Sequence, residues 1–235
     1  MHATHAPVPG THPLPPGMQA PLPGTEAALL GLAALAVVMI PFLWPLVEHF
    51  NAIAHEGAHA LVGSVMGFRS TGVKLDIESS GETAWHPKTP VTGPRRTLTR
   101  FVGYLGPSGF GLAAAKLIET GRAVSVLWIG TFLLVLLLFL IRKSFGIVSV
   151  PAAILLLAVI MHNAHDRLEE IIIYGITWLL LLSGVRVAVA HGAGAGDARN
   201  LRATTHIPRL IWALLWMAGT VLAVIIGGKW LVLGS

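Results

Sequence analysis

The sequence predicts an all-α polytopic membrane protein with about seven transmembrane helices and one small surface β-hairpin. Three observations lead to this fold class: 54% of the 235 residues are hydrophobic, only 11% are charged, and the apolar residues gather in long runs. A typical soluble domain carries roughly 25% charged residues, and a domain of this size cannot bury so much apolar surface. Disorder of the whole chain is excluded too, because disordered chains combine low hydrophobicity with high charge.

Composition also excludes several function classes. The chain has no cysteine, which rules out a disulfide framework and a cysteine nucleophile. The formal net charge is +5, but the 16 Lys and Arg residues are scattered between apolar runs. They therefore do not form the continuous basic face that nucleic-acid binding requires. We expect a lipid bilayer around the chain and no nucleic-acid partner.

The first element is a tail over residues 1–24. It contains seven prolines and no Lys or Arg, and this composition predicts disorder. A secretory signal peptide is not expected, because the basic n-region is missing. The three histidines of the tail are interpreted as incidental rather than as a metal site. We expect residues 25–235 to form one membrane-embedded domain.

Seven apolar runs follow, each roughly as long as a bilayer-crossing helix needs to be. Pro45 separates the first two runs. The fifth run is the shortest, and whether it crosses the membrane fully stays open at this stage. The predicted spans are 27–44, 46–67, 101–118, 123–141, 145–161, 170–190 and 208–230.

The basic residues predict an orientation. If all seven runs cross the membrane, 12 of the 16 Lys and Arg residues lie on the side of the N-terminus and four on the other side. Cytoplasmic loops carry an excess of Lys and Arg. The sequence therefore predicts a cytoplasmic N-terminus and a C-terminus on the outer side.

The long connection after the second run predicts a β-hairpin at the membrane surface. Val73, Leu75 and Ile77 alternate with charged residues, a turn signal follows at 79–81, and residues 82–86 can return as a second strand. A plain solvated loop is the alternative interpretation.

The second run is unusual because polar side chains interrupt it. A charged residue at mid-membrane costs about 2.5–3.5 kcal/mol on insertion scales, and such residues face the bundle interior or a wet cavity. They therefore indicate a functional site by default. The polar residues of this run are Glu48, His49, Asn51, His55, Glu56 and His59.

The spacing of three of these residues indicates a metal site. His55 and His59 are one helical turn apart on one face, so their imidazoles can share one tetrahedral Zn²⁺ ion. Glu56 lies on the adjoining face, where its carboxylate can act as a general base in a His-Glu-x-x-His motif. The alternative is a structural polar cluster, or a proton or ion relay.

This motif within a membrane span resembles the site-2 protease family of intramembrane zinc metalloproteases. A second segment, residues 103–111, is similar to the Gly-Pro segment that begins a core helix of that family. Its glycines are also consistent with close helix packing alone. The layout of residues 46–232 is similar to a compact bacterial branch of the family, which implies the bacterial cytoplasmic membrane as location.

A catalytic zinc keeps three protein ligands and one open position, so a third ligand is needed. The resemblance implies an aspartate on a later core helix, usually before glycine, but this chain has no Asp-Gly pair. Asp197 and Asp166 are the two candidates. The predicted topology favours Asp197, because it lies on the membrane side toward which the His59 end of the second run points, whereas Asp166 lies on the opposite side. Four histidines near span ends are weaker alternatives: His162, His165, His191 and His206.

Together these features predict an intramembrane zinc metalloendopeptidase that hydrolyses a peptide bond of a membrane-protein or peptide substrate. His55, His59 and Asp197 would hold the zinc, and Glu56 would be the catalytic base. The hairpin would hold an unwound stretch of substrate as an added strand. The alternatives are a non-enzymatic ion or metal transporter that uses the same polar helix, and a pseudoprotease.

Overall fold

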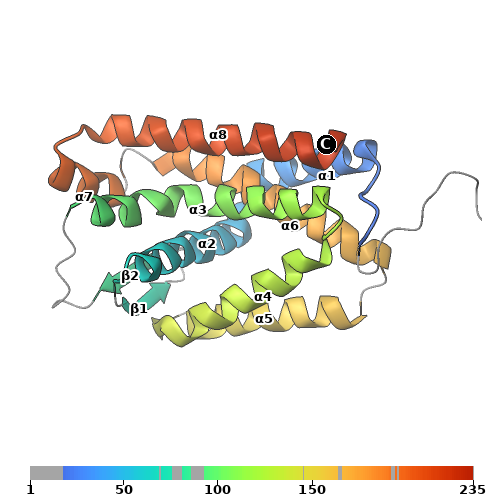
Figure 1. The fold of residues 1–235 in the computed structure, drawn as a ribbon, viewed down its shortest axis with the longest axis horizontal. Coiled ribbons are helices and arrows are strands. Elements are labelled where there is room, and N and C mark those ends of the chain that lie inside the picture. Colours follow the sequence, from blue (N-terminus) through green and yellow to red (C-terminus); the bar gives the residue numbers. More distant parts are fainter. Residues whose placement is uncertain are drawn as a thin grey trace, which may run out of the picture.

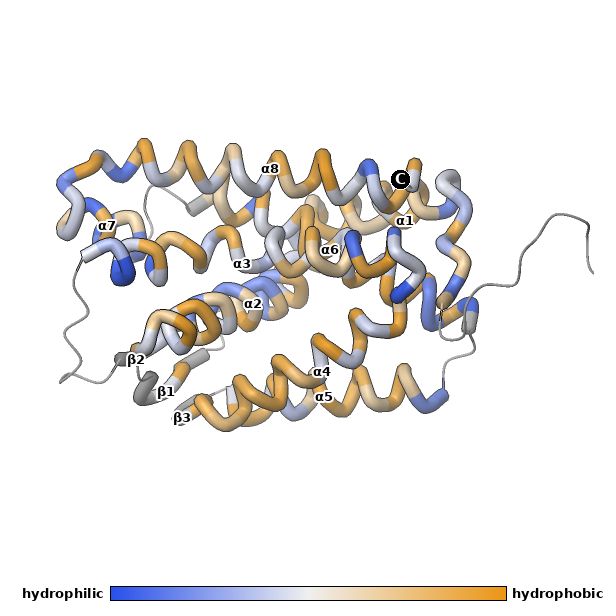
Figure 2. The backbone as a smooth tube through the Cα atoms, in the orientation of Figure 1, coloured by the Kyte–Doolittle hydropathy of each residue, from blue (hydrophilic) through white to orange (hydrophobic). Residues whose placement is uncertain are grey.

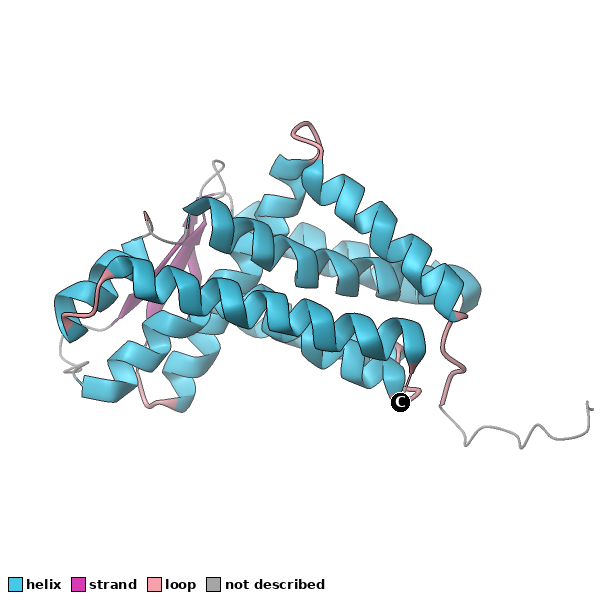
Figure 3. Cartoon of the chain, turned by 90° about the horizontal axis from the view of Figure 1, so that it is seen from above, coloured by secondary structure: helices cyan, strands magenta, loops and turns pink. Residues whose placement is uncertain are grey.

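The computed structural model describes residues 18–68, 70–75, 81–85, 93–144, 146–163, 166–191, 194 and 196–234. These residues form a bundle of eight α-helices with one three-stranded sheet at one end (Figures 1 and 3). The helices are α1 (Gly24–Met39), α2 (Trp44–Val65), α3 (Gly93–Glu119), α4 (Val124–Leu140), α5 (Gly146–Asn163), α6 (Asp166–His191), α7 (Gly196–Thr205) and α8 (Arg209–Leu233). The strands are β1 (Ser70–Leu75), β2 (Gly81–Trp85) and β3 (Ile141–Ser144). Of the predicted disordered tail, residues 1–17 lie outside the described residues.

The outer surface of the bundle is apolar, as an integral membrane protein requires. Large hydrophobic side chains are exposed along the outer helices, for example Phe132 on α4, Leu155 on α5 and Ile225 on α8, and Figure 2 shows α4 and α5 as almost continuously hydrophobic. Within the described residues, α3, α5, α6 and α8 are long and apolar enough to cross a membrane, and the α1–α2 pair adds a fifth candidate if it counts as one span.

The structure corrects the predicted count of about seven transmembrane helices. A helix covers each of the seven predicted runs, but not every helix is a separate crossing. α1 has 16 residues and α4 has 17, so each is shorter than the shortest candidate span, α5, which has 18. α1 and α2 meet at a bend of 100°, as in a broken span or a re-entrant loop, rather than as two straight crossings. The short fifth run does form a helix of sufficient length, α5.

Two prolines explain the break between α1 and α2. The residue before a proline is disfavoured in helical conformation, and Ile40, which precedes Pro41, is extended at ψ 119° where α1 ends. Pro45 lies in the first turn of α2, where a missing N–H costs nothing. The sequence prediction treated Pro45 as the separator, whereas Pro41 ends the first helix. The guanidinium of Arg186 secures the bend, since it donates to the Val38 carbonyl and lies 4.0 Å from the centre of the Trp44 ring.

This bend also corrects the predicted position of the two chain ends. A Cβ atom at Gly24, the start of α1, would lie 2.2 Å from the carbonyl oxygen of Val232, near the end of α8. Figure 1 likewise shows α1 and the C-terminal end of α8 together, at the end of the bundle away from α7 and the sheet. The prediction placed the two ends on opposite sides because it counted α1 and α2 as two crossings.

Small residues let the long helices approach closely at the centre of the bundle, as is common in membrane proteins. A Cβ at Gly227 of α8 or Gly111 of α3 would lie 2.9 Å from the side chain of Leu181 on α6. Trp178, also on α6, donates its indole N–H to the Ala27 carbonyl of α1 over 3.0 Å. α6 is therefore the central helix against which α1, α3 and α8 pack.

The predicted β-hairpin is present, and it belongs to a larger sheet. β1 and β2 pair antiparallel, with Leu75 opposite Gly81 and Val73 opposite Thr83. β3 pairs parallel to β1, so the strand order is β2-β1-β3 and β2 is an edge strand. The prediction missed β3 because Ile141 ends an apolar run that continues from α4. The sheet links the α4–α5 pair to the end of α2.

α2 ends in a Schellman motif that turns the chain into this sheet. Gly67 has a positive φ of 83°, a conformation that glycine adopts without strain. Its N–H donates to the Ser64 carbonyl, and the N–H of Phe68 donates to the Gly63 carbonyl over 2.8 Å. α2 thus ends at Val65, and four residues separate it from β1, which begins at Ser70.

Candidate metal centre

The polar residues of α2 point into the protein rather than toward lipid. Asn51, Glu56 and His59 are buried, although Figure 2 shows that the helix contains several hydrophilic positions between its apolar ones. Buried polar groups of this kind need partners. The partners of the motif residues come from α3, α7 and the sheet.

Three side chains from two helices converge at one point. The Nε2 atoms of His55 and His59, one turn apart on α2, lie 3.1 Å from each other. Each of them lies 3.2 Å from Oδ2 of Asp197 on α7. Among the described residues, these three form the one cluster in which three His, Cys, Asp or Glu ligand atoms could hold a metal ion.

A backbone contact determines which nitrogen of His59 faces this point. Nδ1 of His59 lies 2.7 Å from the carbonyl oxygen of Thr99 on α3. A carbonyl oxygen can only accept, so Nδ1 carries the proton, and in a neutral imidazole Nε2 then presents a lone pair. Such a hydrogen bond to the outer nitrogen is the usual support for a metal-ligating histidine.

Asp197 reaches the cluster from the first turn of α7. Ala198 and Leu201 on the same short helix are buried and anchor it to the bundle. Burial alone would raise the pKa of the Asp197 carboxyl, but the hydrogen bonds and charges of His55 and His59 outweigh it and lower the pKa below its usual value. The group is therefore an anionic carboxylate at neutral pH.

The other aspartate lies elsewhere. Asp166 begins α6, and α7 follows the far end of that helix. The 26 residues of α6 span about 38 Å, so the start of α6 and the start of α7 belong to opposite ends of the bundle. The structure brings Asp197 to the histidine pair and does not bring Asp166 there.

Glycines of α3 create the space for the cluster. A Cβ at Gly103 would lie 2.4 Å from Nε2 of His59 and 2.6 Å from Nε2 of His55. A Cβ at Gly106, one turn further, would lie 2.6 Å from the Cβ of Ala58 on α2. The glycine segment therefore serves close packing, and at Gly103 this packing places bare backbone against the ligand atoms.

Glu56 is held by the sheet. Its carboxylate accepts a hydrogen bond of 2.5 Å from the hydroxyl of Thr83 on β2, and its side chain is buried. The sequence predicted both the hairpin and Glu56 but not their contact. The pairing of β2 with β1 and the turn at Gly67 after α2 place this edge strand against the motif helix.

An aromatic stack supports His55 from the side of α3 and α8. The ring of Tyr104 lies edge-on to His55 at 4.9 Å between centroids and stacks on Trp216 at 4.4 Å. Trp216 in turn donates its indole N–H to the Phe101 carbonyl over 2.7 Å. Sequence reasoning missed Thr99, Tyr104 and Trp216, because nothing in their local spacing marks them as neighbours of α2.

The donor set fits a divalent cation. Two imidazole nitrogens and one carboxylate oxygen lie within 4.8 Å of one another. When both imidazoles are neutral, as metal ligation requires, the three atoms are all acceptors and the set carries one negative charge. Two histidines and one carboxylate leave one position open on a tetrahedral ion, the arrangement of catalytic zinc sites. Glu48 and His49 lie earlier on α2 and are not part of the cluster.

Comparison with known proteins gives one match. A family model described as Peptidase M50B-like matches residues 28–227, which covers both α2 and α7. No curated protein and no solved structure matches the chain.

Proposed function

The chain belongs to the Peptidase M50B-like family, and from this premise we propose that it is an active intramembrane zinc endopeptidase. The match confirms the resemblance to the site-2 protease family that the motif of α2 indicated. Family and apolar helices together make the chain an integral membrane protein of a metallopeptidase family. One observation carries the proposal: His55, His59 and Asp197 converge beside a buried glutamate of the same helix.

The proposed roles follow from the contacts. His55, His59 and Asp197 would hold Zn²⁺, which when bound lowers the pKa of water toward about 7 and polarises a carbonyl group. Glu56 would take a proton from the attacking water and return it to the leaving amine. Thr83 would hold the Glu56 carboxylate in one rotamer, and Thr99 would keep the lone pair of His59 directed at the cation.

The substrate is proposed to be a membrane protein or peptide that binds in extended form. A transmembrane helix keeps its carbonyls in internal hydrogen bonds, so it must unwind before cleavage. β2 is an edge strand of the sheet, and edge strands can pair with an added strand. A peptide paired with β2 would pass the Thr83–Glu56 contact, which supports the sheet as the substrate platform.

The charge distribution supports an orientation in a bacterial cytoplasmic membrane. The start of α3, the end of α6 and α7 carry Arg95, Arg96, Arg100, Arg186, Arg199 and Arg202 at the metal-site end. The opposite end carries only Lys116, Arg122, Arg167 and Lys229 among the described residues. The positive-inside rule then places the metal-site end in the cytoplasm. The end of α8 would lie on the outer side, as the sequence predicted. The start of α1, which lies beside it, would be on the outer side too, whereas seven crossings predicted a cytoplasmic N-terminus.

The test combines metal content with cleavage. Purified protein is expected to contain about one zinc per chain and to cut a co-reconstituted single-span peptide whose helix is interrupted by Gly or Pro. Glu56→Gln is expected to keep zinc and lose cleavage, because the amide cannot accept the proton of the water. Glu26→Gln, at the opposite end of the bundle, is the matched control and is expected to keep both. Zinc without cleavage in the wild type would favour a transporter or pseudoprotease, and absence of any transition metal would reject the site.

A further inference from the structure

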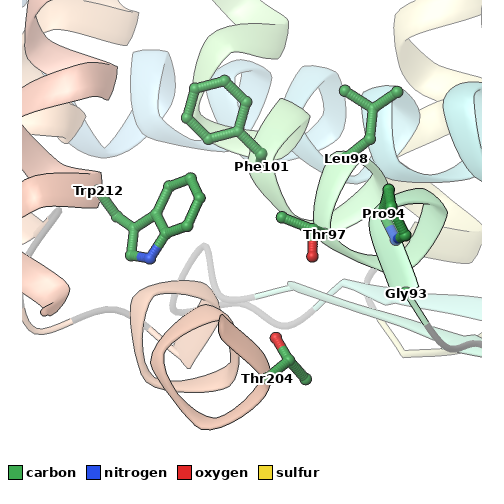
Figure 4. Close-up of a pocket in the computed structure, with 7 residues that line it drawn as sticks. All are labelled: Gly93, Pro94, Thr97, Leu98, Phe101, Thr204 and Trp212. Atoms are coloured by element: carbon green, nitrogen blue, oxygen red, sulfur yellow. The ribbon is translucent and has the colours of Figure 1, made fainter. Parts of the chain in front are cut away.

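A cavity lies between α3, α7 and α8, apart from the metal centre. Its volume is about 450 Å³, and its walls include Thr97, Leu98 and Phe101 of α3, Thr204 of α7 and Trp212 of α8. Small-molecule sites commonly measure about 300–1,000 Å³ and combine an apolar lining with a few placed polar groups. Figure 4 shows the hydroxyls of Thr97 and Thr204 and the indole nitrogen of Trp212 around the same space.

One wall of this cavity has an unused hydrogen-bond donor. Trp212 is 8% exposed, and its Nε1 atom has no hydrogen-bond partner among the described residues. Leaving a buried N–H unsatisfied costs about 1–3 kcal/mol, and Trp and Tyr usually find partners when buried. The neighbouring Trp216, by contrast, donates to the Phe101 carbonyl. The cavity therefore fits an apolar molecule with an acceptor oxygen within reach of Trp212.

The cavity does not face the proposed scissile site. Thr97 and Phe101 lie two residues from Thr99 and Gly103 on α3, a rotation of about 200°. Because Thr99 and Gly103 contact His59, the cavity is on the opposite side of α3. A substrate held there would be separated from Glu56 by a helix, so the occupant is not the peptide being cut.

The surroundings identify the class of occupant. Beside the cavity, the outer face of α8 exposes Leu210, Leu214 and Leu215, as a lipid-facing helix does. Arg209 is exposed and lies one turn before Trp212, at the start of α8. We propose that this cavity binds an anionic glycerophospholipid, with an acyl chain against Phe101 and Leu98, an ester carbonyl accepting from Trp212, and the phosphate beside Arg209.

Such a lipid would also steady α7. This helix lines the cavity with Thr204 and carries Asp197 about two turns away. A lipid wedged between α7 and α8 would restrict the motion of α7 relative to α3. Lipid binding and the ordering of α7 do not depend on the proposed metal site. Only an effect of the lipid on zinc affinity would depend on that site.

The test measures bound lipid on the full chain by native mass spectrometry. Delipidated protein is titrated with dioleoyl phosphatidylglycerol, and with dioleoyl phosphatidylcholine in parallel. We expect each chain to bind one phosphatidylglycerol molecule tightly and to bind phosphatidylcholine more weakly. Trp212→Phe, which removes the donor and keeps an aromatic ring, should weaken binding roughly 2- to 10-fold, whereas Trp128→Phe on exposed α4 should not. Thr97→Phe, which fills the cavity, should abolish the tight site.

Two further variants and one further readout complete the test. Arg209→Gln should reduce the preference for the anionic lipid, and Lys229→Gln at the other end of α8 should leave it. Hydrogen exchange of residues 196–205 should slow on addition of phosphatidylglycerol in the wild type and not in Thr97→Phe. Equal lipid binding by the wild type, Trp212→Phe and Thr97→Phe, or recovery of a polypeptide instead of phospholipid from the undelipidated protein, would overturn the proposal. None of these readouts depends on zinc or cleavage.

Discussion

Gly103 and His59 are in contact across the α2–α3 interface, and a single added methyl group at Gly103 would lie 2.4 Å from the Nε2 atom that faces the candidate metal. Real Cβ contacts essentially never come this close. Either the imidazole or the helix must move. This contact therefore defines how accurately α3 must be placed for the metal centre to form.

The first prediction concerns that contact. Gly103→Ala is expected to weaken zinc binding roughly 5- to 150-fold, the range that corresponds to an overpacking cost of about 1–3 kcal/mol. Gly109→Ala on the same helix is the matched control, because a Cβ there meets nothing within 4 Å. Zinc affinity is measured by competition with a chelator. Equal affinities for both variants would show that α3 does not constrain the histidine pair.

The second prediction separates the two aspartates. Asp197→Ala removes the anionic ligand of the cluster, so zinc content and cleavage should both be lost. Asp166→Ala alters the opposite end of the bundle and should preserve both. Elemental analysis of the purified variants checks the metal. Loss of zinc in Asp166→Ala with retention in Asp197→Ala would reverse the assignment.

The third prediction concerns the hydroxyl that holds Glu56. Thr83→Val keeps the branched shape suited to a strand and removes the donor. A hydrogen bond to a charged group contributes about 1.5–3 kcal/mol, so kcat should fall roughly 10- to 100-fold while zinc content stays at the wild-type value. Thr131→Val is the control, since the Thr131 hydroxyl is buried on α4 without a partner among the described residues. An unchanged kcat would reduce Thr83 to a packing role.

The fourth prediction tests the orientation with single cysteines in a cysteine-free chain. Three exposed positions are suitable: Thr25, Thr120 and Ala203. In intact cells an impermeant thiol reagent should label Thr25→Cys and Thr120→Cys, while Ala203→Cys should react only after permeabilisation. Protection of Thr25→Cys together with labelling of Thr120→Cys would restore the two-crossing interpretation of α1 and α2.

The part of the candidate site that comes from neighbouring residues on one helix could be predicted from the sequence. His55, Glu56 and His59 are part of one helical turn, and their cost in an apolar run marks them without knowledge of the fold. A topology argument predicted that Asp197 lies near the histidine pair, and it does, because α6 carries the chain from one end of the bundle to the other. The helix that carries it was not predicted: Asp197 lies in the first turn of α7, between the predicted spans 170–190 and 208–230, and this helix is anchored by Ala198 and Leu201.

Contacts between distant parts of the chain could not be predicted from the sequence. The four residues of β3 become a strand only because β1 lies beside them, and no pattern within Ile141–Ser144 indicates that pairing. The contacts of Thr83 and Thr99 likewise depend on how α2, α3 and the sheet meet. The predicted number of membrane crossings was wrong for a related reason. Hydropathy shows that α1 and α2 are apolar, but it does not show the bend between them. That bend depends on Pro41 and on how both helices pack against α6.

The candidate ligands lie far apart along the chain, so they are synthesised at different times during translation. His59 and Asp197 are 138 residues apart, and translation proceeds at about 5–20 residues per second, so roughly 7 to 28 s pass between the synthesis of the two. During that interval α2 is already made while its third ligand has not yet been translated. A nascent chain therefore has no complete candidate metal centre until α7 has been synthesised.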